Sequence, residues 1–378
     1  MNDVRIERIG RTKRELHRFF DVAEKIYEDD PHWVAPVRAD LVKILSPENP
    51  FFWHAEMELF IARRDGADVG RIAAILDRHH NDFHGERTGF FGYFESENDR
   101  AVADRLVEAA AGWARERGLN ILRGPANPSL NAEAGLLVEG FDAPPVFMMT
   151  YNPAYYCQLL EKAGFRKAKD LFAYRIEPSA GPLERLQRLA RRTRRRMTGL
   201  RVRPITRGSL EADLPNVREV YNAAWQGNWG FVPMTREDLA FIARRLKPLL
   251  DRDFSSLAEI RRPDGSCEPI GFLVALRDFN QAIAPTRGRL FPLGWLKFLL
   301  AARRIRTLRL LTFGIKEEWR LRGIDAVLFE ESLRAILRRG VTSVEASWIV
   351  EDNLPMIRGI EFWRGYRYKT YRLYERPL

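Results

Sequence analysis

Short apolar runs alternate with amphipathic stretches along the chain, and the same order of segments occurs twice. Each half starts with a helical pattern, at 14–27 and 214–225, and continues with two apolar runs around a glycine turn, at 58–76 and 257–277. A short strand, an amphipathic helix that ends before a glycine, and a second strand then follow. These central segments are 89–94, 100–117 and 119–123 in the first half, and 308–315, 326–339 and 343–350 in the second. Such alternation predicts a mixed α/β sheet in each half.

Matching residues at fixed distances indicate that the two halves are copies of one fold. Gly70 and Gly271 follow equivalent hairpin turns and are 201 positions apart, as are Asn152 and Asn353. The glycines that end the two central helices are 222 positions apart, because the second copy has 21 additional residues before its central strand. The expected organisation is a first domain at 1–178, a basic linker helix at 179–207 and a second domain at 208–378.

The composition is that of a globular protein with more than one core. The chain has 378 residues, 46% apolar and 30% charged, and at about 150 residues per domain this length favours two domains. Two cysteines, Cys157 and Cys267, exclude a disulfide scaffold and fit a reducing compartment. We see no signal peptide and no apolar stretch of about 18 residues that could span a membrane. We therefore expect a cytoplasmic protein.

The positive charge is concentrated in one segment. The net charge is +11, and residues 180–207 contain ten arginines, no lysine and one acid, Glu184. The rest of the chain is therefore nearly neutral, which gives little support for nucleic-acid binding by the protein as a whole.

A loop between the 308–315 strand and the next helix has the composition of a phosphate-binding site. It reads Arg320-Leu-Arg-Gly323-Ile-Asp325-Ala326. Backbone N–H groups at a helix N-terminus bind phosphate, and small residues let the phosphate approach. Asp325 is the exception, because an acid that faced the phosphate would repel it.

This loop, together with Asn353 and the Gly365-Tyr366 pair beyond it, resembles the motifs of the GNAT superfamily of acyl-CoA N-acyltransferases. The family's pyrophosphate loop has the form Q/R-x-x-G-x-G/A, from which Asp325 departs. The resemblance implies two GNAT-like domains in tandem, with acyl-CoA as co-substrate of the second. The residues that it assigns to acyl-CoA are Thr312, Phe313, Gly314, Ile315, Arg320, Arg322, Gly323, Ile324, Asp325 and Ala326.

The first copy keeps the expected elements but not the loop. Its equivalent segment, 95–103, contains three carboxylates and no glycine. We expect this copy not to bind CoA in the usual way.

Transfer of an acyl group to an amine needs a proton acceptor and a donor to the oxyanion. All histidines lie at or before His84, so the base of the second copy must be a carboxylate or a water. The family's thiol-protonating tyrosine is replaced by Ile360-Glu361. The candidate catalytic residues are Glu317, Glu351, Asn353 and Tyr371, with Glu318, Asp352, Tyr366 and Tyr374 as alternatives. Each acid also fits a solvated strand end. The histidines of 79–84 lack metal-ligand spacing, so we expect no metal.

Two loops are candidates for the acceptor site, although both also fit loops that pack only for stability. The first joins a polar cluster to the apolar run 144–149, and the second is the aromatic segment 225–233. Their candidate residues are Asn127, Ser129, Asn131, Glu133, Trp225, Asn228 and Trp229. The chain also resembles bacterial tandem-GNAT proteins called predicted N-acyltransferases, some of which are linked to ceramide synthesis. The segments that carry this resemblance are 124–131, 140–145 and 225–233.

Two further segments suggest an anionic membrane surface as a partner. Leu290–Ala302 has one charge in 13 residues and is flanked by arginines, which fits a helix in the bilayer interface or a buried helix of the second core. The Arg185–Arg203 segment fits a basic membrane surface or a solvated linker helix. Nucleic acid is the weaker expectation for it.

These observations predict an N-acyltransferase that joins an acyl group from acyl-CoA to a primary amine. Because both apolar, basic segments suit membrane-borne substrates, we expect a long-chain or lipid amine and a peripheral location at the inner face of the membrane. The alternatives are a Fem-type aminoacyl transferase that uses aminoacyl-tRNA, a non-catalytic acyl-CoA-binding or scaffold protein, and an acetyltransferase of small molecules.

Overall fold

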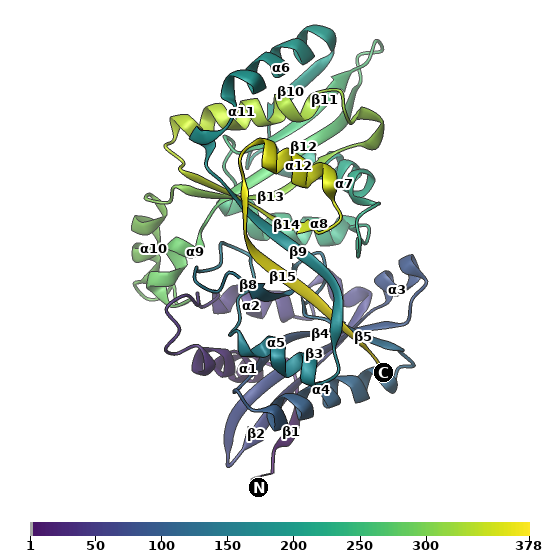
Figure 1. The fold of residues 1–378 in the computed structure, drawn as a ribbon, viewed down its shortest axis with the longest axis vertical. Coiled ribbons are helices and arrows are strands. Elements are labelled where there is room, and N and C mark those ends of the chain that lie inside the picture. Colours follow the sequence, from purple (N-terminus) through teal and green to yellow (C-terminus); the bar gives the residue numbers. More distant parts are fainter. Residues whose placement is uncertain (1–2) are drawn as a thin grey trace. The chain divides into compact units, whose positions relative to one another are not determined.

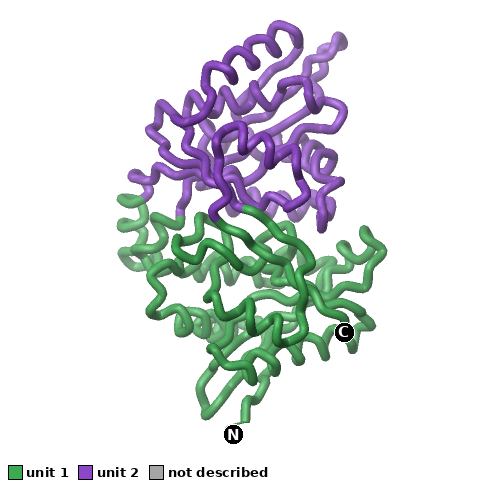
Figure 2. The backbone as a smooth tube through the Cα atoms, in the orientation of Figure 1, with its two compact units in different colours: residues 1–172, 280–301, 369–378 green, residues 173–279, 302–368 purple. Residues whose placement is uncertain are grey.

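The chain forms two units whose sequence ranges interpenetrate (Figure 2). The structure is a computed structural model that describes residues 3–378. Unit 1 runs to Phe172 and also contains Asn280–Ala301 and Lys369–Leu378, whereas unit 2 contains Ala173–Phe279 and Ala302–Tyr368. Both units therefore draw on both halves of the sequence.

Unit 1 is a sheet with helices on both faces (Figure 1). Its elements are β1 (Arg5–Ile9), α1 (Lys13–Ile26), α2 (Arg38–Leu45), β2 (Ala55–Arg64), β3 (Ala67–Asp77), α3 (Arg78–His84), β4 (Thr88–Ser96), α4 (Arg100–Arg115), β5 (Ile121–Gly124), β6 (Ala126–Asn127), β7 (Glu133–Ala134), β8 (Leu136–Glu139) and α5 (Tyr155–Lys162). Strands β1 to β5 are neighbours in chain order, antiparallel except for the parallel pair β4–β5. Successive residues of β3 face opposite sides of the sheet. Ile72 therefore packs with α4 and α5, and Ile75 packs with α1 on the other side.

Unit 2 repeats this arrangement. Its elements are α6 (Leu183–Arg196), β10 (Leu200–Pro204), α7 (Leu210–Trp225), α8 (Arg236–Leu246), β11 (Ser255–Arg261), β12 (Cys267–Arg277), β13 (Thr307–Ile315), α11 (Ile324–Arg338), β14 (Ser343–Val350) and α12 (Leu354–Phe362). Strands β10 to β14 are again neighbours in order, with β13–β14 as the parallel pair. Phe272 packs with α7 and α8, and Leu273 packs with α11 on the other face. The mixed α/β fold predicted for two copies is confirmed.

The last strand of the second copy completes the sheet of the first. Strands β9 (Arg166–Ile176) and β15 (Tyr366–Pro377) each pass from one unit into the other. Within unit 1, β15 pairs with β5 and with β8. The buried ammonium of Lys369 donates to the carbonyl oxygens of Gly140 and Ala143 at 2.6 and 2.7 Å. Arg372 binds Asp170 at 2.8 Å, so ion pairs and backbone pairing both hold this strand.

The basic segment forms a helix that packs on α11 within unit 2. Leu186, Ala190 and Thr193 are the buried residues of α6. The guanidinium of Arg194 binds Glu330 at 3.0 Å and Glu331 at 2.6 Å. The remaining arginines of this helix are exposed to solvent.

The apolar segment Leu290–Ala302 contains α10 (Gly294–Ala302), and the short helix α9 (Asn280–Ile283) precedes it. Residues Asn280–Ala301 belong to unit 1. Asn280 anchors this part of the chain, because its side-chain amide donates to the carbonyl oxygen of Pro145 at 2.9 Å. Helix α10 has no buried residue. The alternative of a buried helix in the second core is therefore wrong. Among the described residues, no helix combines the length and the apolar character needed to cross a bilayer.

Candidate active site

Strands β13 and β14 of unit 2 part along their length and open a cleft. They are paired from Thr307 and Ser343 as far as Leu310 and Ala346, but both strands continue for several residues beyond that pair. A register shift between β12 and β13 leaves Leu311 as an extra residue at the same point. The resulting cleft measures about 660 Å³.

The cleft brings together predicted residues from four places in the sequence. These are the end of α7 and the loop after it, strand β13, the loop and first turn of α11, and the start of α12. The predicted residues that line it are Trp225, Asn228, Thr312, Phe313, Gly314, Ile315, Arg320, Ile324, Asp325 and Asn353, together with Asp352, one of the alternative acids. The lining residues that sequence reasoning missed are Ala224, Gly227, Leu310, Leu311, Trp319, Leu321, Ala346, Ser347, Trp348, Ile349, Val350, Pro355 and Met356. Five of these lie on β14, whose sequence gives no sign that one edge of the strand is unpaired.

Phe313 presents a backbone N–H group to the parted strands. The backbone N–H of Lys316 donates to the carbonyl oxygen of Ile270 on β12 at 3.0 Å. Because hydrogen-bonded and non-bonded pairs alternate in an antiparallel ladder, Gly314 also bonds to β12 and Phe313 faces the opposite edge. The indole N–H of Trp225 donates to the carbonyl oxygen of Phe313 at 3.2 Å, which holds the following peptide, between Phe313 and Gly314. The N–H is thus placed where an oxyanion could accept it.

The loop before α11 exposes a helix N-terminus to the cleft. Gly323 is the N-cap residue, with φ +86°, and no side chain caps the helix. The first-turn N–H groups of α11 therefore lack intrahelical partners. Arg320 ties the loop down, since its guanidinium donates to the carbonyl oxygens of Ile315 at 3.2 Å and Ala224 at 2.7 Å. The predicted residues Arg322, Gly323 and Ala326 shape this loop and helix but do not line the cleft.

Asp325 lies in the first turn of α11, exposed, and lines the cleft. Its side chain does not cap the helix. A carboxylate here interacts favourably with the positive end of the helix. It also competes with any anion for the same N–H groups.

Asn353 is the N-cap of α12, where its side-chain oxygen accepts the backbone N–H of Met356 at 3.3 Å. Its predicted catalytic role stays a prediction. The same holds for Glu317, which is exposed, and for the half-buried Glu351. Neither of these two acids lines the cleft.

A buried pair of charges lies next to the point where the strands part. Arg309 and Glu345 are opposite each other in the β13–β14 register, one residue before Leu310 and Ala346, and are 1% and 2% exposed. The Tyr368 hydroxyl donates to Glu345. Burial raises the pKa of Glu345, although Tyr368 and Arg309 oppose this shift. A charge inside each of two apolar strands was the sequence signal that could have found this pair.

In unit 1 the equivalent positions are filled by the protein's own side chains. The Asn127 side-chain oxygen accepts the Tyr93 N–H at 2.7 Å, beyond the last paired residues of β4 and β5. Asp99 caps α4 through the Ala101 N–H at 2.8 Å, so this helix N-terminus is already occupied. Glu95 is buried, and burial raises its pKa.

The other predicted residues lie elsewhere. Ser129, Asn131 and Glu133 are in or beside the β6–β7 hairpin of unit 1, where Glu133 pairs with Asn127. Trp229 is half-buried in the loop after α7. Their assignment to the acceptor stays a prediction, as does a role for Tyr371, which is fully buried in unit 1 opposite Leu137.

The remaining alternatives to Tyr371 are also outside the cleft. Tyr374 is buried in unit 1 and donates to Glu161 at 3.1 Å, and Tyr366 is exposed at the start of β15. Burial and Glu161 contribute to a raised pKa of Tyr374. Among the described residues, no group of three or more His, Cys, Asp or Glu side chains could hold a metal ion.

Two relatives align with nearly the whole chain, although no protein-family model matches it. The bacterial ceramide synthase of Caulobacter vibrioides (strain NA1000 / CB15N) is 36% identical over 376 residues, which is 97% of this chain and 96% of that protein. Protein YghO of Escherichia coli (strain K12) is 35% identical over 375 residues, covering 97% of this chain and 94% of that protein.

Solved structures share the fold. A tandem GNAT protein from the clavulanic acid biosynthesis pathway has a TM-score of 0.61 at 14% identity, covering 99% of this chain and 98% of that one. A GCN5-related N-acetyltransferase from Sphaerobacter thermophilus has a TM-score of 0.54 at 14% identity, covering 99% and 95%. The tandem GNAT fold expected from the sequence is confirmed.

Proposed function

The chain belongs to the tandem GNAT acyltransferase family of the bacterial ceramide synthase, and we propose that it transfers a fatty acyl group from acyl-CoA to the primary amine of a lipid such as a sphingoid base. The observation that carries this proposal is the parting of β13 and β14 beside the uncapped N-terminus of α11. The name of the relative supports the lipid amine as acceptor.

The cleft offers hydrogen-bond donors for both the pyrophosphate and the thioester of acyl-CoA. The uncapped N–H groups of α11 would hold the pyrophosphate, while the thioester carbonyl would accept the N–H of Phe313. The amine then attacks the carbonyl carbon, a C–N bond forms and the C–S bond breaks. The amine loses its proton to a base, and the sulfur leaves as a thiolate that takes up a proton. Trp225 and Asn228, on the cleft wall, are the proposed acceptor contacts in this unit.

The proposed base is a carboxylate or a water. The sequence favours Glu317 and Glu351 for this role. We add Glu345, because burial raises its pKa and a less acidic carboxylate is the stronger base. Its register neighbour Ala346 lines the cleft.

The segment Leu290–Ala302, which contains helix α10, supports the proposal that the protein works at an anionic membrane surface on the inner face. Six apolar side chains along this segment are exposed, with Phe291 at 85% and Leu293 at 68%. The others are Trp295, Leu296, Leu299 and Leu300. Soluble proteins rarely expose so many neighbouring apolar side chains.

Exposed arginines flank this apolar segment on both sides, at 287, 289, 303, 304 and 306. Each arginine or lysine near an anionic bilayer contributes about 1 kcal/mol to the free energy of membrane binding. Apolar side chains that enter the bilayer interface strengthen the binding further. Trp295 is of the type that settles at the headgroup level. The segment thus combines the two attractions that a peripheral membrane protein needs.

Flotation with vesicles tests the membrane surface. The wild type is expected to float with vesicles of phosphatidylcholine and phosphatidylglycerol, and the double variant Phe291→Ser/Leu293→Ser is expected to stay in solution. Trp53→Ser is the matched control, because Trp53 is 69% exposed elsewhere in unit 1. Equal flotation of all three proteins would contradict the membrane role of α10.

Ligand-induced stabilisation tests the donor site. A ligand at 100 times its dissociation constant raises the unfolding free energy by about 2.7 kcal/mol. Palmitoyl-CoA is expected to raise the melting temperature of the wild type and of Gly340→Trp, but not of Gly323→Trp. Gly340 lies just beyond the other end of α11, where an added Cβ would meet no atom within 4 Å. Stabilisation by aminoacyl-tRNA and by no CoA species would instead favour the Fem-type reaction.

A further inference from the structure

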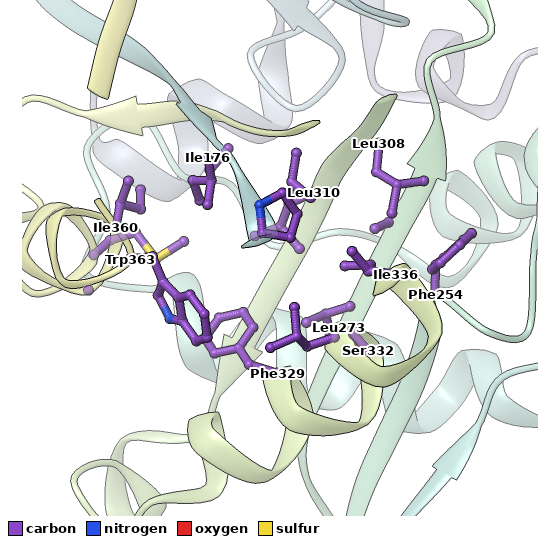
Figure 3. Close-up of a pocket in the computed structure, with 17 residues that line it drawn as sticks. Ile176, Phe254, Leu273, Leu308, Leu310, Phe329, Ser332, Ile336, Ile360 and Trp363 are labelled. Atoms are coloured by element: carbon purple, nitrogen blue, oxygen red, sulfur yellow. The ribbon is translucent and has the colours of Figure 1, made fainter. Parts of the chain in front are cut away.

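Unit 2 contains a second space, an apolar cavity of about 110 Å³ between its sheet and two helices (Figure 3). Seventeen residues line it, and none of these carries a charge. Among the side chains labelled in the close-up, Ser332 supplies the hydroxyl and Trp363 the indole nitrogen, while the rest are hydrocarbon. A cavity with so few polar groups does not hold ordered water and suits a hydrocarbon ligand.

The cavity follows from the periodicity of the elements around it. Helix α11 turns Phe329, Ser332, Leu333 and Ile336 toward it, a spacing of three, four and seven that marks one helix face. Neighbouring strands contribute residues two apart, which lie on one face of the sheet. In a filled core these stripes would touch, but here they leave a space.

The cavity and the cleft share three lining residues, Leu310, Ala346 and Met356. Leu310 and Ala346 are the last paired residues of β13 and β14. The two spaces are therefore adjacent, and both reach the point where the strands part, beside the proposed position of the thioester. Met356 has a flexible, unbranched side chain that can adapt to a ligand passing it.

Further into the cavity, the next residues on the same strand face are Leu308 and Val344, which are also opposite each other in the register. Helix α12 continues the wall with Gly359, Ile360 and Trp363. Gly359 adds no side chain, and a Cβ built there would meet no atom within 4 Å. Beyond the shared residues the cavity is thus bordered mainly by hydrocarbon.

We propose that this cavity binds the hydrocarbon tail of a fatty acyl thioester whose carbonyl lies in the cleft, and that it selects the donor by chain length. The inference rests on the proposed acyltransferase function and adds where the chain goes. At about 10–15 Å³ for each water-sized group, the cavity accommodates on the order of eight groups of methylene size. Each buried methylene is expected to strengthen binding about fourfold until the cavity is full.

Substitutions at Ser332 test this assignment. Ser332→Phe fills the space from α11, and Ser332→Ala is the matched control that removes the hydroxyl without adding volume. Ala275→Leu, a lining residue of β12, fills the space from the sheet and keeps the test independent of one variant's folding. Each protein is measured with butanoyl-, octanoyl-, dodecanoyl- and palmitoyl-CoA, by equilibrium binding and by amide formation.

The wild type and Ser332→Ala are expected to bind the longer donors at least 100-fold more tightly than butanoyl-CoA. Both filled variants are expected to lose at least tenfold in affinity for long donors and to change less than twofold with butanoyl-CoA, which also shows that they are folded. An unchanged chain-length profile in both filled variants would overturn the inference. So would a wild type that binds all four donors equally. Tight, length-dependent binding without amide formation would keep the cavity assignment and refute the acyltransferase function instead.

Discussion

Thr193 of α6 packs its hydroxyl against Gly323, the N-cap residue of α11. The hydroxyl lies 3.5 Å from the carbonyl oxygen of Arg322, and a Cβ added to Gly323 would overlap it. The basic helix therefore supports the loop that would hold the donor's pyrophosphate. It also leaves Gly323 as a position where only glycine fits, because its φ is +86°.

Replacement of Gly323 by alanine is expected to weaken CoA binding at least tenfold. The new methyl group would push the loop away from Thr193, and the positive φ would add strain of about 1–3 kcal/mol. Gly340→Ala is the control, since Gly340 also has a positive φ, +65°, but open space around its Cβ. It should lose about 1 kcal/mol of stability and keep its affinity for CoA. Equal loss of affinity in both variants, measured by calorimetric titration, would show that general destabilisation explains the effect.

Asp325→Asn is expected to tighten the binding of CoA. The substitution removes a negative charge beside the proposed pyrophosphate site, which is worth ~1 kcal/mol or about fivefold in affinity. The effect should shrink as salt is added, because screening weakens exposed charges. Glu184→Gln, which removes an exposed acid from the start of α6, is the matched control and should change little. An unchanged affinity in Asp325→Asn would place the phosphates elsewhere.

The buried pair Arg309 and Glu345 is expected to respond asymmetrically to substitution. Arg309→Met leaves a buried carboxylate without its neighbouring charge and should lower the unfolding free energy by about 3–5 kcal/mol. The double variant Arg309→Met/Glu345→Leu should recover part of this loss, because no buried charge of the pair remains. Arg338→Met removes an exposed arginine from the last turn of α11 and should have an effect within about 1 kcal/mol. Additive losses in urea unfolding of the double variant would show that the two side chains do not interact.

Acid is expected to destabilise the protein through His80, which is buried in unit 1. Burial lowers the pKa of His80 from 6.5 to about 4. The unfolded chain therefore binds a proton between these values while the folded chain does not. Stability from this residue is present above pH 6.5 and is lost as the pH falls toward 4, by up to about 3 kcal/mol. His80→Gln should flatten the slope of unfolding free energy against pH in this range, and an unaltered slope would assign the acid sensitivity to other groups.

Local patterns predicted most elements of the fold because each one carries its own periodicity and end signals. The helix expected at 326–339 is found at Ile324–Arg338, and the strand expected at 308–315 at Thr307–Ile315. The exchange of β15 into unit 1 has no such local signal. Its pairing of Tyr374 with Gly124 joins residues 250 positions apart, and any apolar strand edge would have looked equally suitable.

The candidate site also contains features that the sequence signals locally and features that it does not. The loop at Gly323 could be found because glycine and a helix start stand together in the sequence. The cleft wall on β14 could not be found, because residues such as Trp348 look like ordinary strand residues until the loss of pairing beyond Ala346 is seen. Exposure was equally hidden for α10, since 13 nearly uncharged residues fit a buried helix as well as an exposed one.

Production of an amide with release of free CoA tests the central claim most directly. The wild type is mixed with palmitoyl-CoA and a sphingoid base on vesicles that contain phosphatidylglycerol, and amide and thiol are quantified together. The account predicts equal amounts of N-acylated base and free CoA, turnover that continues beyond one equivalent, and loss of both products in Gly323→Ala but not in Gly340→Ala. Thiol release without amide would indicate hydrolysis, and no product with any acyl-CoA and amine tested would contradict the acyltransferase assignment.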